Sequence, residues 1–143
     1  MCVRKSVVDH HSAAGHKKPH GQRLAENAQE LAFYIDSDPD LILVRERGFH
    51  RFARETENIF KMVGVSDYIA WSHAQKTFEE ITPTSIKKKL TGKSRASKEE
   101  VAAILPLYIG GVLFDFDDES DAVALGICWL IQHGYIDAKG IAK

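Results

Sequence analysis

Acidic residues are concentrated in Asp115–Asp121, where five of seven residues carry a carboxyl group. Asp118 and Asp121 are three residues apart, so in a helix they share one face and both can reach a hard cation such as Mg²⁺. Acids at a helix start also complement the helix dipole and cap free amides, which explains two or three of them without any function. Five acids are more than capping requires, so this segment is a candidate metal site.

A further carboxylate, Glu46, follows the apolar run Leu41–Val44. That run is typical of a buried parallel strand, and ligands of open α/β sheets lie at the carboxyl ends of strands. Because Glu46 stands between Arg45 and Arg47, a solvated ion-pair cluster is the competing interpretation.

The segment Thr82–Lys98 contains six basic residues and no acid. Such a concentration around a glycine and several hydroxyls can bind phosphates, although a solvated lysine face explains it equally well. Carboxylates beside a basic segment suit metal-assisted cleavage of a nucleic-acid backbone. The seven histidines lack zinc-ligand spacing.

The composition fits one domain over residues 1–143, in which residues 1–20 are expected to be irregular apart from one short strand over Val3–Val8. The net charge is −1, and no run approaches the roughly 18 apolar residues that a membrane helix needs. Cys2 and Cys128 form neither a disulfide framework nor a metal pair, which suits a reducing compartment. We therefore expect a cytoplasmic protein.

Helical spacing and local stop signals predict the elements that must hold these residues. The expected helices are Gln22–Ile35, Phe52–Val63 ending at Gly64, a short helix from Pro83 to Gly92, Val101–Tyr108 after a Ser97/Glu100 capping box, and Asp121–His133. The expected strands are Val3–Val8, Leu41–Val44 and Tyr68–Trp71, with a short segment opening at Ile81. Helices alternating with short buried strands indicate an α/β layer fold.

Three segments together resemble RuvC-type Holliday junction resolvases, particularly the phage-like and low-GC Gram-positive versions. These segments are Asp40–Phe49, Thr84–Val101 and Asp117–Ile127, in that order. The resemblance spans about residues 17–133 and implies a ribonuclease H-like mixed sheet flanked by helices. It also implies a homodimer that cuts four-way DNA junctions with Mg²⁺ or Mn²⁺.

The resemblance assigns roles by position in this sequence. Glu46, Asp118 and Asp121 match metal-binding carboxylates, and Lys87 matches the basic residue near the scissile phosphate. Phe49 matches an aromatic residue that packs against bases at the crossover. The DNA-binding residues expected with it are Arg47, Lys88, Lys93, Arg95 and Lys98.

One part of the family pattern is missing, because no Ile-Gly-x-Asp-like first strand precedes these segments. We therefore expect an N-terminally truncated fold that lacks one metal ligand and cleaves weakly or not at all. Association is expected through the open strand edge or the helix Phe52–Val63. The alternatives are a non-catalytic DNA-binding or structural remnant of this fold and an unrelated α/β protein whose acids only cap a helix.

Overall fold

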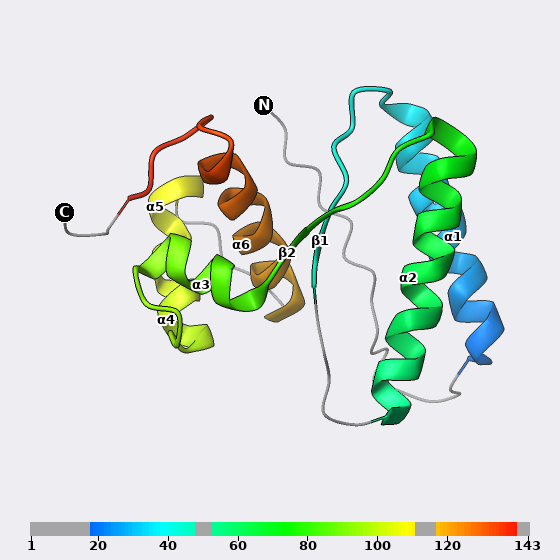
Figure 1. The fold of residues 1–143 in the computed structure, drawn as a ribbon, viewed down its shortest axis with the longest axis horizontal. Coiled ribbons are helices and arrows are strands. Elements are labelled where there is room, and N and C mark those ends of the chain that lie inside the picture. The colour runs from blue at the N-terminus through cyan, green and yellow to red at the C-terminus, as the bar shows by residue number, and fades with distance from the viewer. Residues whose placement is uncertain (1–17, 48–52, 111–116, 140–143) are drawn as a thin grey trace. The chain divides into compact units, whose positions relative to one another are not determined.

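The computed structural model describes residues 18–47, 53–110 and 117–139. Within these ranges it has six helices and two strands, in the order α1 (His20–Ser37), β1 (Val44–Glu46), α2 (Ala53–Ala74), β2 (Glu79–Ile81), α3 (Pro83–Thr91), α4 (Lys98–Ile104), α5 (Pro106–Ile109) and α6 (Asp117–Gln132) (Figure 1). The chain divides into two compact units. The helical unit contains described residues 18–43 and 53–79, and the sheet unit contains 44–47, 80–110 and 117–139.

In the helical unit, α1 packs against α2. Ile35, Leu43 and Ala70 are buried at the centre of this packing. A hydrogen bond of 3.0 Å between His73 Nδ1 and Asp36 Oδ1 joins the two helices. The helix predicted over Gln22–Ile35 is confirmed and extends by two residues at each end.

The prediction of a helix stop at Gly64 and a strand over Tyr68–Trp71 is wrong, because α2 continues through both. A glycine inside a helix costs only about 1 kcal/mol relative to alanine. Burial of Ala70 against the other core residues of the helical unit favours continuation. The helix ends where Gln75 adopts a left-handed φ of 54°.

The two strands form a two-stranded sheet. Glu79 N donates to Leu43 O and Arg47 N donates to Ile81 O, both at 2.9 Å. Residue numbers rise together along both strands, so the pairing is parallel, as predicted. The predicted bounds Leu41–Val44 are wrong, since the strand begins at Val44 and ends at Glu46.

The sheet unit has its own apolar core, in which Leu90, Leu105 and Cys128 are fully buried. The helices α3, α4 and α6 contact one another around it, and α6 also contacts β1. The remaining buried members are Ile81, Ile86, Ala96, Val101, Ala124, Ile127, Trp129 and Leu130.

Local signals fix both ends of α3 and the start of α4 as the sequence predicts. Thr82 accepts a hydrogen bond from Ser85 N before α3, and Gly92 ends this helix with a φ of 78°. Both hydrogen bonds of the Ser97/Glu100 capping box are present. The predicted helix Val101–Tyr108 is instead two helices, because Pro106 starts α5 directly after α4.

The last helix begins at Asp117, four residues before its predicted start. The acids at positions 118 and 121 therefore lie within α6. The predicted strand Val3–Val8 lies outside the described residues. Among the residues that the structure describes, no helix is both long and apolar enough to cross a membrane.

Candidate carboxylate site and basic segment

Glu46 is the last residue of β1 and is exposed. Side chains alternate between the faces of a strand, so Glu46 shares a face with Val44. Val44 packs against the apolar core that includes residues of α6. The exposed carboxylate therefore extends from the end of the sheet face that α6 covers.

Asp121 lies in the second turn of α6 and is bonded to the basic segment. Lys98 Nζ, at the start of α4, donates to Asp121 Oδ2 at 3.0 Å. The two side chains are 63% and 42% exposed, so solvent screens this ion pair. The contact joins the predicted phosphate-binding segment to a predicted metal ligand.

The predicted three-acid site is described only in part. Glu46 and Asp121 lie on β1 and α6, which contact each other, whereas the side chain of Asp118 lies outside the described residues. Among the described side chains, no group of three His, Cys, Asp or Glu residues could hold a metal ion. The two described candidates supply carboxylate oxygens, which are the ligand type that Mg²⁺ and Mn²⁺ prefer, so the donor chemistry fits these ions.

Both arginines that flank Glu46 form ion pairs with an acid on the neighbouring strand. Glu80 Oε1 accepts a hydrogen bond from Arg45 Nε at 2.9 Å and lies 2.7 Å from Arg45 Nη2 in an ion pair. Arg47 Nε lies 3.8 Å from Glu80 Oε2. The two arginines therefore pair with Glu80, an acid that the ion-pair interpretation of this segment did not include.

The predicted basic residues lie on α3, on the turn after it, and at the start of α4. Lys87, which is half-buried, and Lys88, which is exposed, lie on α3. Lys93 Nζ bonds to Glu100 Oε1 at 3.0 Å. Arg95 is exposed in the following turn, and Phe49 lies outside the described residues.

Hydrogen bonds hold the pKa of Glu100 below its ordinary value. The larger cause is the bond donated by the Ser97 backbone amide, and the second is the bond from Lys93. This carboxylate therefore ties Lys93 to the start of α4 and remains ionised at neutral pH.

Two contacts in the candidate site were not predicted from the sequence: the ion pairs of Glu80 with the arginines and the Lys98–Asp121 pair. Opposite charges on neighbouring strands stabilise a sheet when they face each other. In this sequence one helix separates Arg45 and Arg47 from the acids Glu79 and Glu80. That pattern could have indicated the first contact. The second joins residues 23 positions apart, and no local signal predicts it.

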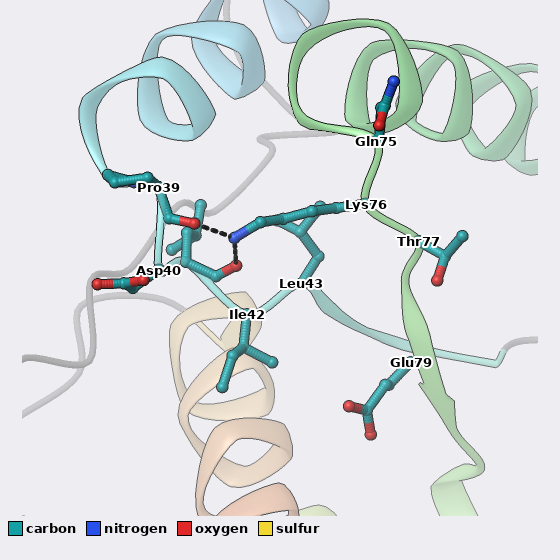
Figure 2. A pocket seen from close by; sticks show the side chains of 9 residues that line it. Pro39, Asp40, Ile42, Leu43, Gln75, Lys76, Thr77 and Glu79 are labelled. Atoms are coloured by element: carbon teal, nitrogen blue, oxygen red, sulfur yellow. Dashed lines mark hydrogen bonds between the residues drawn. The ribbon is translucent and has the colours of Figure 1, made fainter.

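An open pocket of 440 Å³ lies elsewhere, in the helical unit (Figure 2). Its lysine, Lys76, donates to Pro39 O at 2.5 Å and to Leu41 O at 2.6 Å, as Figure 2 shows. This ammonium group holds a loop by bonding two of its carbonyls. The pocket contains none of the predicted site residues.

Comparison with known proteins agrees with the sequence resemblance. No family model matches the chain. The crossover junction endodeoxyribonuclease RuvC of Paracoccus denitrificans is 29% identical over 119 residues, which is 82% of this chain and 70% of that protein. The protein of the same name from Caldanaerobacter subterraneus subsp. tengcongensis is 23% identical over 106 residues, 73% of this chain and 64% of that protein.

Solved structures show the same relationship in the fold. Thermus thermophilus RuvC matches with a TM-score of 0.71 at 18% identity, over 85% of this chain and 75% of that one. T. thermophilus RuvC in complex with Holliday junction substrate also matches with a TM-score of 0.71, at 19% identity, over 80% of this chain and 70% of that one. The resemblance drawn from the sequence is therefore confirmed, and the chain is RuvC-like in both sequence and fold.

Proposed function

We propose that this chain is a Holliday junction resolvase-like endonuclease that binds branched DNA and a divalent cation. The observation that carries the proposal is the likeness to RuvC in sequence and fold, in a chain whose β1 ends at Glu46 and contacts the helix that holds Asp121. Asp118 completes the proposed ligand set for Mg²⁺ or Mn²⁺. When bound, this ion would activate water and stabilise charge on the scissile phosphate.

The basic segment is proposed to hold the DNA backbone. Lys87 would neutralise charge on the phosphate under attack, and Phe49 would stack on a base at the crossover. The remaining proposed phosphate contacts are Arg47, Lys88, Lys93, Arg95 and Lys98. Such contacts make affinity fall steeply with salt.

The first test compares a four-way junction with a duplex of the same total length and sequence. The proposal expects tighter binding to the junction, and cleavage in Mg²⁺ or Mn²⁺ that is lost in Asp118→Asn and Asp121→Asn. Asp137→Asn is a matched control, since it removes an exposed acid outside the proposed site. Equal affinity for duplex and junction would support an unrelated α/β protein.

A non-catalytic DNA-binding role is the second candidate, and the Lys98–Asp121 ion pair favours it. An acid that already holds an ammonium group is partly neutralised without a metal. Under this alternative, junction binding persists while Mn²⁺ titration detects no site that depends on Asp118 and Asp121. A metal site that disappears in both variants supports the enzyme.

We propose that the chain acts as a homodimer that uses α2. Three large side chains, Phe60, Tyr68 and Trp71, are 58%, 70% and 59% exposed on this helix. With Gly64 they follow a spacing of four, four and three residues, so they form one stripe, the α2 stripe. An uncovered aromatic stripe is typical of an interface.

A cytoplasmic location, expected from the cysteines, also stays a prediction.

A further inference from the structure

Residues 92–96, the basic turn, join α3 to α4 and carry two of the proposed phosphate contacts, Lys93 and Arg95. Turns of exposed polar residues are ordinarily mobile, because few buried contacts hold them. The basic turn is anchored at its end by Ala96, which is 1% exposed and belongs to the apolar core of the sheet unit. Its start is held by a side chain that has no assigned role, that of Thr91.

The Thr91 hydroxyl group bonds to the backbone on both sides of Gly92. It donates to Lys87 O at 2.8 Å, one helical turn earlier in α3, and it accepts from Lys93 N at 3.1 Å. Gly92 has a left-handed φ of 78°, and its amide donates to Lys88 O at 2.9 Å. These bonds fix the direction in which the chain leaves α3, and with it the path of the basic turn.

The side chain of Lys93 is held from the other end of the turn. Its Nζ lies 3.0 Å from Glu100 Oε1, and Glu100 Oε2 accepts a hydrogen bond from Ser97 N at 2.8 Å. The Lys93 side chain is 70% exposed, and an ammonium group has three donors, so it can bind a phosphate while it keeps Glu100. Lys93 is therefore tied to α3 through its backbone and to α4 through its side chain.

We propose that Thr91 is a positioning residue for phosphate binding by the basic turn. A loop that is already ordered loses less conformational entropy when it binds than a mobile loop does. Thr91 carries no charge, so it raises DNA affinity by holding Lys93 and Arg95 in a fixed arrangement. This inference rests on the proposed function, because it takes the backbone of branched DNA as the ligand.

The first test is Thr91→Val, which removes the hydroxyl group and keeps the size of the side chain. We expect affinity for a four-way junction to fall about fivefold, the effect of one ordinary hydrogen bond. The slope of log affinity against log salt should stay the same, because the turn makes the same phosphate contacts once it is ordered. Lys93→Gln should instead reduce this slope by about 0.9, since it removes a contact. Thr91→Ser keeps the hydroxyl group and should bind like the unchanged protein.

The same substitution is then made in Lys93→Gln/Arg95→Gln, which lacks both cations of the turn. Here Thr91→Val should cause no further loss of affinity, because no charge remains to be positioned. A merely structural role predicts the same loss in both backgrounds. Thr77→Val is the matched control, since it removes a hydroxyl group from an exposed threonine of the helical unit, and it should change affinity in neither background. Equal losses from Thr91→Val in the two backgrounds would overturn the inference.

A second readout needs no DNA and separates this inference from the proposed function. In ¹⁵N relaxation of the free protein, the amides of residues 92–95 should become more mobile in Thr91→Val, but not in Thr91→Ser or Thr77→Val. If no DNA binds and the turn loosens in this way, the proposed function is wrong and the positioning of the turn stands. If DNA binds equally well to Thr91→Val and to the unchanged protein, or the turn stays rigid in Thr91→Val, the positioning role is wrong and the proposed function stands.

Discussion

Lys98 Nζ lies 3.0 Å from Asp121 Oδ2, so the first residue of α4 is bonded to the second turn of α6. The sequence places these residues in separate segments, one basic and one acidic, whose opposite charges cancel in the net charge of −1. The structure brings one member of each segment into contact. A lysine that we propose to bind phosphate and an aspartate that we propose to bind metal are thereby coupled.

This contact predicts competition between Lys98 and a divalent cation for Asp121. Lys98→Gln removes the ammonium group, so we expect Mn²⁺ affinity to increase by up to about fivefold, the range of a solvent-screened ion pair. Calorimetric titration of the DNA-free protein measures this. Lys93→Gln is the control, because its partner Glu100 is not a proposed ligand. Unchanged or weaker binding in Lys98→Gln would show that the lysine does not oppose the metal.

The segments that could be predicted are those whose signals are local. The Thr82 side chain accepts a hydrogen bond from the Ser85 amide ahead of Pro83, and Ser97 and Glu100 bond each other's backbone amides. Both helix starts lie where the sequence indicates. Tyr68–Trp71 was wrong because its β-forming composition is outweighed by burial of Ala70 against α1, which is a tertiary contact. The ion pairs of Glu80 and Lys98 join segments that are distant in the sequence, so they could be identified only once the fold was known.

The capping box predicts acid sensitivity of the start of α4. The pKa of Glu100 is lowered in the folded chain, so its contribution to stability is present above the unfolded value of 4.5 and is lost as pH falls through the folded value. We expect Glu100→Gln to lower the melting temperature at pH 7. We also expect the melting temperature of this variant to decrease less than that of the unchanged protein when the pH is lowered. Thermal unfolding monitored by circular dichroism at several pH values measures both effects. Glu30→Gln, in the middle of α1, is the control and should change neither the melting temperature at pH 7 nor its decrease at acidic pH. If Glu100→Gln and Glu30→Gln show the same dependence of melting temperature on pH, the prediction is wrong.

Cys128 is predicted to be inert in the folded protein. It is fully buried, and burial raises the pKa of its thiol from 9.0 to about 11. Because the thiolate is the reactive form, we expect Ellman's reagent at pH 8 to label it only after urea unfolding. The measurement uses a Cys2→Ser background, so that a single thiol is counted. Rapid labelling of the native protein would show that the core around α6 opens readily.

Gly64 allows the proposed dimer to be tested without disturbing the fold of the subunit. A Cβ atom built at this position meets nothing within 4 Å, and the glycine lies in the middle of the α2 stripe. Gly64→Arg should therefore block the approach of a second copy, while replacement of a mid-helix glycine raises helix propensity by about 1 kcal/mol. We expect light scattering to give the mass of one chain for this variant and of two chains for the unchanged protein, with no loss of melting temperature. Gly21→Arg, in α1, is the control, since that position is equally open and lies outside the stripe. A dimer that survives Gly64→Arg, or an unchanged protein that is monomeric, would exclude α2 as the interface.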